Sequence, residues 1–99
     1  MLLFALKIQY PDNFVLLRGN HELPEVCTSL HYNNSLKQEI MDRFTDVEQD
    51  AVLFEILKCF TYLPLICVID NKIVCTHGCI PSALKNFDTI SKIKLPFDP

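Results

Sequence analysis

Runs of apolar residues predict the elements at the start of the chain. Residues 1–9 are apolar almost all round and stop before Tyr10 and Pro11, which predicts the C-terminal part of a buried helix ended by the proline. Residues 14–17 are a short, continuous apolar run with turn residues on both sides. Such a run predicts a fully buried strand in a sheet covered on both faces. The next five residues, RGNHE at 18–22, then lie on the loop at the carboxyl end of that strand, where α/β proteins usually build their sites.

A helical period appears in the middle of the chain. Residues 35–45 carry apolar side chains three and four positions apart, and Ser35 is suited to cap the helix that this spacing predicts. A second amphipathic helix is predicted from 47 to 60, with its charged residues on the solvated face. One or two short helices are expected between residues 81 and 93.

Beyond residue 60 the period changes to that of a strand. Residues 65–69 and 73–76 are rich in β-branched residues and flank the turn sequence DNK, so they predict a β-hairpin. The second strand leads directly into His77 and Gly78. The chain therefore repeats one pattern, in which an apolar strand ends in a loop that contains a histidine and a glycine.

Composition limits the class of protein. A hydrophobic fraction of 49% excludes disorder and exceeds what a small, self-contained domain needs, which suggests part of a larger α/β unit. We treat residues 1–99 as one partial domain with no internal boundary. The net charge of −3, without a basic cluster, argues against a nucleic-acid partner. No run approaches the roughly 20 apolar residues of a membrane span, so no membrane partner is expected.

Cysteine usage points to a reducing compartment. The chain has five cysteines, an odd number, and four of them lie inside apolar runs. This pattern indicates reduced, buried thiols in the cytoplasm or nucleus rather than a disulfide framework. The five are Cys27, Cys59, Cys67, Cys75 and Cys79.

The two histidine loops carry the candidate chemistry. Asparagine and histidine side chains bind divalent first-row metals through oxygen and nitrogen. A histidine that keeps its proton can instead act as general acid to a leaving alkoxide. The glycines of the two loops, Gly19 and Gly78, let a metal or phosphate approach the backbone. A buried carboxylate needs partners, so we expect Glu22 to orient its loop rather than to react.

Two sequence blocks together resemble a known family. "FVLLRGNHE", followed by "LPLICVIDNKIVCTHG", closely resembles the catalytic core of the PPP-family serine/threonine protein phosphatases, which belong to the calcineurin-like metallophosphoesterase superfamily. The resemblance implies part of a β-sandwich flanked by helices, incomplete in this chain. It implies hydrolysis of phosphoserine and phosphothreonine proteins at a centre of two divalent ions, typically manganese, iron or zinc, with specificity supplied by regulatory subunits.

The resemblance also implies roles for individual residues. Asn20 and His77 match ligands of the second metal, and His21 matches the general acid that protonates the leaving oxygen. Arg18 belongs to the same block, and we expect it to serve in packing or in support of the loop. In the family the second block closes as His-Gly-Gly, whereas this chain has Cys79 at the last position. His31 lies outside both blocks and is expected to be a surface histidine.

The remaining family blocks are missing from this sequence. Family members carry Gly-Asp-x-His-Gly and Gly-Asp-x-Val-Asp-Arg-Gly upstream, whereas neither glycine of this chain is followed by aspartate. Stable binding of a first-row ion usually takes at least three protein ligands, commonly including an anion. We therefore expect at most a partial second-metal site, with poor metal binding and no appreciable phosphatase activity in the chain alone.

Two other functions remain open from the sequence. Cys75, His77 and Cys79 alternate, so on a continued strand they would share one face and offer a zinc module three ligands. Alternatively, the chain is a non-catalytic, phosphatase-like interaction protein or pseudoenzyme that acts through its exposed apolar faces.

Overall fold

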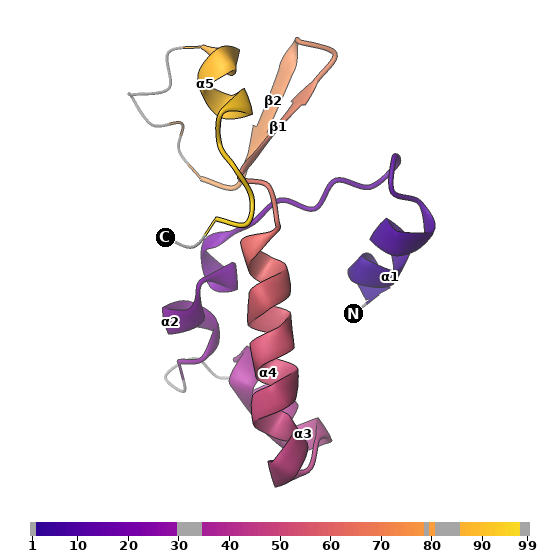
Figure 1. Cartoon of the computed structure of the whole chain (residues 1–99), viewed down its shortest axis with the longest axis vertical. Helices are drawn as coiled ribbons and strands as arrows, with labels where there is room; N and C mark the ends of the chain where they lie inside the picture. Colours follow the sequence, from indigo (N-terminus) through magenta and orange to yellow (C-terminus); the bar gives the residue numbers. More distant parts are fainter. Residues whose placement is uncertain (1, 30–34, 79, 81–85, 98–99) are drawn as a thin grey trace.

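Helices dominate the architecture of the chain. The computed structural model describes residues 2–29, 35–78, 80 and 86–97 (Figure 1). Its elements in chain order are α1 (Leu2–Gln9), the 3-10 helix η1 (Asn20–Glu22), α2 (Pro24–Cys27), α3 (Leu36–Arg43), α4 (Asp46–Thr61), β1 (Ile66–Ile69), β2 (Ile73–Thr76) and α5 (Phe87–Ser91). The predicted α/β class is confirmed, and the part of the predicted sandwich that the structure describes is one two-stranded sheet.

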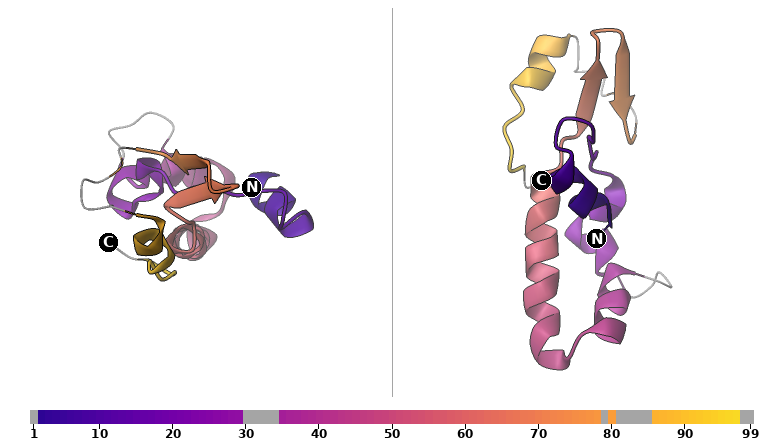
Figure 2. Two further views of the ribbon diagram at one scale, coloured as in Figure 1. Left: turned by 90° about the horizontal axis from the view of Figure 1, so that it is seen from above. Right: turned by 90° about the vertical axis from the view of Figure 1, so that its right-hand side faces the viewer.

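Helices α3 and α4 form an antiparallel pair, which Figure 2 shows side by side. Ser35 caps α3 by accepting a hydrogen bond from the Gln38 amide at 3.2 Å, as the sequence predicts. At the start of α4, the Glu48 carboxylate accepts bonds from the Thr45 hydroxyl and amide. These bonds hold the pKa of Glu48 below its usual range. The apolar face of α4 is half-buried: Val52, Leu53, Ile56, Leu57 and Phe60.

The predicted β-hairpin is confirmed. β1 and β2 pair antiparallel, with Val68 opposite Val74. Asp70 and Asn71 have φ angles of 50° and 52°, the left-handed values that a type I′ turn requires at both central positions. Aspartate and asparagine tolerate this region better than other residues with side chains, which explains why the chain reverses here.

The N-terminal segment differs from its prediction. Helix α1 forms, but it is not buried, since Leu2 is 73% and Ile8 81% exposed. The prediction of a strand at residues 14–17 is wrong for the described chain: the segment has no strand assignment, and Val15 is exposed. A strand exists only when a neighbour completes its hydrogen bonds, and β1 and β2 pair with each other instead. A continuous apolar run therefore predicted burial that nothing in the described chain provides.

The molecule is open for its length. Its radius of gyration is 15.5 Å, whereas a compact chain of this length has about 13 Å. Its accessible surface is 7822 Å², whereas a compact monomer of this size exposes about 5800 Å². In the part of the chain that the structure describes, the buried apolar residues are Cys27 and Ile40, which are 5% and 4% exposed. The elements thus share only a small core.

The two remaining helices, α2 and α5, are short. α2 was not predicted, although Pro24 at its first position is a common start signal. α5 lies within the region predicted as helical, and the rest of that prediction, at residues 81–85, lies outside the described residues. Among the described helices, none combines the length and apolar character needed to cross a bilayer.

The described cysteines are free thiols that differ in burial. Cys27 is buried, Cys67 and Cys75 are half-buried, and Cys59 is exposed. The prediction of buried thiols is therefore wrong for Cys59 and only partly right for Cys67 and Cys75. Burial raises the pKa of Cys27, because the thiolate loses solvation and nearby carboxylates oppose its charge.

This difference predicts selective alkylation. Iodoacetamide at pH 8 is expected to modify Cys59 at least about tenfold faster than Cys27, because the thiolate is the nucleophile and Cys27 is both inaccessible and harder to deprotonate. Mass spectrometry of tryptic peptides after timed labelling measures both rates. In urea, where both thiols are accessible, the two rates should be equal. Equal rates in the native chain as well would contradict the burial of Cys27.

Candidate active site

The two histidine loops meet in space. η1 carries Asn20 and His21, and the bend after β2 carries His77. The Asn20 Oδ1 atom lies 2.9 Å from the His77 Nε2 atom, although the residues are 57 positions apart. Both side chains are exposed, so the pair faces solvent. The structure thus brings together the two residues for which the sequence predicts one shared ligand.

Gly19 makes this meeting possible. A Cβ atom at Gly19 would lie 3.1 Å from both Cε1 and Nδ1 of the His77 ring, and 2.7 Å from Oε2 of Glu22. The φ angle of Gly19 is −99°, which any residue can adopt. Space, rather than backbone conformation, therefore favours glycine here, because a larger residue would displace the Glu22 carboxylate and crowd the His77 ring.

Glu22 and Arg18 hold the loop from behind. The Gly19 amide donates to Glu22 Oε2 at 2.7 Å, which closes the loop around η1. The Arg18 guanidinium is almost fully buried and donates to the main-chain oxygens of Phe97 at 2.6 Å and Glu22 at 3.3 Å. These contacts give both residues a structural part in the loop. The contact with Phe97 has no signal in the sequence, because a main-chain carbonyl accepts the bond.

The other predicted site residues lie next to this pair in the chain. His21 lies in η1 between Asn20 and Glu22, and it is exposed. Gly78 follows His77 directly, and a Cβ atom there would meet nothing within 4 Å. Cys79, which replaces the second glycine of the family's His-Gly-Gly, lies outside the described residues. His31, which we predicted to be a surface histidine, lies outside them as well.

Comparison with known protein families decides the class. A model of the calcineurin-like phosphoesterase family matches residues 1–99. The chain belongs to the calcineurin-like phosphoesterases. Hydrolysis of phosphoric esters with divalent metals is the general chemistry of that family, and Asn20 and His77 are two exposed polar side chains that the fold of this phosphoesterase brings together.

The Asn20–His77 pair fits one edge of a metal site in this phosphoesterase. The two atoms form a hydrogen bond at 2.9 Å, and two neighbouring ligands about 2.1 Å from an octahedral ion would lie about 3.0 Å apart, so the same two atoms could also reach one ion. One amide oxygen and one imidazole nitrogen are also suitable donors for a first-row ion. However, no group of three or more His, Cys, Asp or Glu that could hold a metal occurs among the described residues. The pair therefore fits a metal in chemistry and spacing, but supplies only two neutral ligands.

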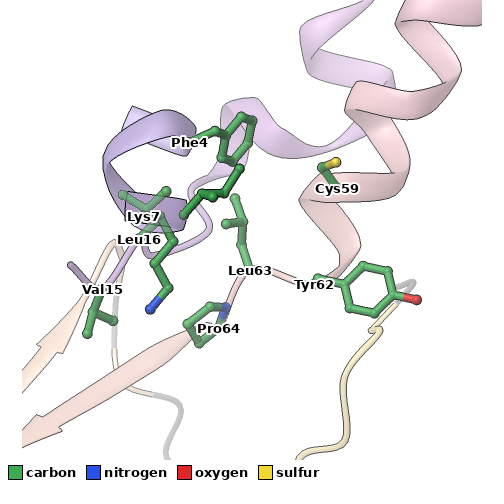
Figure 3. A pocket seen from close by; sticks show the side chains of 9 residues that line it. Phe4, Lys7, Val15, Leu16, Cys59, Tyr62, Leu63 and Pro64 are labelled. Atoms are coloured by element: carbon green, nitrogen blue, oxygen red, sulfur yellow. The ribbon is translucent and has the colours of Figure 1, made fainter. Parts of the chain in front are cut away.

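A separate cavity lies away from this pair. Its volume is about 490 Å³, and it opens between α1 and the C-terminal end of α4 (Figure 3). Its lining is mostly apolar and includes Phe4, Leu16 and Leu63. Lys7 lines it too, but its ammonium group donates to the Pro11 carbonyl. The Tyr62 hydroxyl points away from the cavity. The phosphoesterase therefore has no second cluster of polar groups here that matches the chemistry of the loops.

Proposed function

We propose that this calcineurin-like phosphoesterase is part of the catalytic core of a PPP-type protein serine/threonine phosphatase. The observation that carries the proposal is the 2.9 Å approach of Asn20 Oδ1 and His77 Nε2, which joins the loop RGNHE to the loop after β2. Phosphoserine and phosphothreonine proteins are the proposed substrates. The proposed location is the cytoplasm or nucleus, and regulatory subunits are the proposed partners.

Each residue of the two loops has a part in this proposal. Asn20 and His77 would hold one edge of a divalent ion such as manganese, iron or zinc. When bound, such a centre supplies positive charge and an activated water. His21 lies one residue from Asn20, and we assign it the proton that the leaving serine or threonine oxygen must receive. Glu22 and Arg18 keep the loop in place through their bonds to Gly19 and to main-chain carbonyls.

Complementation tests the proposal. The chain would be mixed with Mn²⁺ and with polypeptides that supply the family blocks absent from its sequence. We expect phosphate release from phosphoserine and phosphothreonine peptides, well above release from a phosphotyrosine peptide or a phosphodiester. Replacement of His21 (His21→Gln) is expected to lower this release by about 10²–10⁴-fold, which is the usual contribution of a general acid.

A matched control tests whether the loss of activity is specific to His21 rather than common to any histidine replacement. The variant His31→Gln changes a histidine outside both blocks and is expected to keep the release of the unmodified chain. Preference for the phosphodiester would place the chain in another branch of the family. Equal loss in both histidine variants would remove the special role of His21.

A non-catalytic interaction protein is the second candidate. The open surface of 7822 Å² and the exposed apolar residues of α1 favour it. Under this alternative, complementing polypeptides bind the chain, but the mixture releases no phosphate from any peptide. Binding and turnover measured in the same mixture therefore separate the two candidates.

A further inference from the structure

Arg18 lies where three segments of the chain meet. It is 4% exposed, and its amide donates to the Pro64 carbonyl at 2.9 Å, just before β1. Its guanidinium donates to Phe97 and Glu22, as described above. Its Nε atom is buried and makes no hydrogen bond within the described residues. Arg18 thus connects the loop, the start of the hairpin and the C-terminal segment.

The C-terminal segment is held by its own contacts. We call residues 93–97 the C-terminal strap. The Phe97 amide donates to the Thr61 carbonyl at 2.9 Å, so both main-chain polar groups of Phe97 are bonded. Ile93 and Leu95 share a small cavity of about 70 Å³ with Pro64, Leu65 and Ile66. Figure 1 shows the strap, in yellow, passing the end of α4 and the start of β1.

We propose that the C-terminal strap positions the Asn20–His77 pair, with Arg18 as the connecting residue. The Phe97 carbonyl holds Nη1 of Arg18, and Nη2 reaches the Glu22 carbonyl. The Glu22 carboxylate fixes the Gly19 amide, and the His77 ring lies against Gly19. The series of contacts therefore runs from the strap to the site without a gap. Its meaning for catalysis rests on the proposed function, whereas the coupling itself does not.

The chemistry of Arg18 makes the coupling sensitive to the strap. A buried guanidinium loses its hydration and must recover it from acceptors. Among the described residues, the acceptors of the Arg18 guanidinium are two carbonyl oxygens and no carboxylate. Each of these two hydrogen bonds therefore contributes a large share of the stabilisation of the buried charge. Loss of the Phe97 carbonyl leaves the charge poorly solvated, and the side chain then moves toward water. The Glu22 carbonyl loses its donor at the same time.

Amide exchange followed by NMR tests the coupling in the full chain. The Gly19 amide reports the loop, and the Lys72 amide, bonded to the Ile69 carbonyl at 3.0 Å, reports the remote turn. We expect Arg18→Gln to accelerate exchange at Gly19 by about tenfold or more, with no change at Lys72. Arg18→Lys keeps the charge but loses the two-pronged geometry, so we expect an intermediate acceleration.

A second variant leaves Arg18 in place. Removal of residues 95–99 takes away the Phe97 carbonyl, and we expect the same acceleration at Gly19 together with a shift of the His77 ring nitrogen signals. The control Phe97→Ala keeps the carbonyl and is expected to leave both unchanged. Unchanged Gly19 exchange after strap removal would overturn the proposal, as would equal acceleration at Lys72. If the coupling holds but complemented chains release no phosphate, the proposed function fails and the strap proposal stands.

Discussion

Replacement of Gly19 by alanine is expected to separate Asn20 from His77. The new Cβ atom would lie 2.7 Å from Glu22 Oε2 and 3.1 Å from two ring atoms of His77, so either the carboxylate or the ring has to move. His77 is exposed and has free space beyond the loop, so we expect its ring to swing away rather than the chain to unfold. NMR contacts between the Asn20 amide protons and the His77 ring are expected in the unmodified chain and are expected to disappear in the variant.

Gly78 provides the matched control for this substitution. It lies in the same site, next to His77, but a Cβ atom there meets nothing within 4 Å. Neither described glycine has a positive φ, so alanine at residue 78 brings no backbone strain. Gly78→Ala is therefore expected to keep the contacts between Asn20 and His77. Similar spectra for Gly19→Ala and the unmodified chain would show that the observed packing of His77 on Gly19 is wrong.

Titration of the isolated chain with Mn²⁺ is expected to give no site of micromolar affinity. Asn20 and His77 offer one amide oxygen and one imidazole nitrogen, and two such ligands without a carboxylate do not displace enough hydration from a dication. Isothermal calorimetry should therefore show only the heat of dilution at micromolar protein concentrations. Turnover of an aryl phosphate in the same samples is expected to be absent. A micromolar site with turnover would contradict this expectation.

Complementation turns the same titration into a positive test. Polypeptides that supply the missing aspartates and histidines are expected to create a site whose affinity depends on this chain. Asn20→Ala and His77→Ala should each weaken that site by about 10–100-fold, while Asn86→Ala, at the cap of α5, leaves it unchanged. If the alanine variants bind Mn²⁺ as well as the unmodified chain does, the two residues are not ligands.

The sequence predicted those elements whose signals are local. Ser35 and its apolar spacing predicted α3, and the DNK turn predicted the hairpin of β1 and β2. The prediction of a strand at residues 14–17 was wrong because a strand depends on a partner, which a local pattern cannot provide. The prediction that α1 is buried was wrong for the same reason. Local chemistry defined the elements, whereas the burial of their apolar faces required knowledge of what packs against them.

The candidate site was also predicted only in part. The proximity of Asn20 and His77 follows from the two sequence blocks, and the structure places the two atoms 2.9 Å apart. The space requirement at Gly19 was not predicted, because it depends on where the ring of His77 lies. The contact of Arg18 with Phe97 could not be predicted from the sequence, because the acceptor is a main-chain atom 79 positions away and carries no residue-specific signal.

The small apolar interior has a consequence for how the chain melts. Within residues 2–29, 35–78, 80 and 86–97, Cys27 and Ile40 are the only apolar residues that are buried, and neither is fully so. The heat capacity increment of unfolding scales with newly exposed apolar area, so it is small here, and the enthalpy that sharpens a thermal transition is small as well. We therefore expect heating to loosen the helical pair, the hairpin and α1 gradually rather than in one cooperative transition.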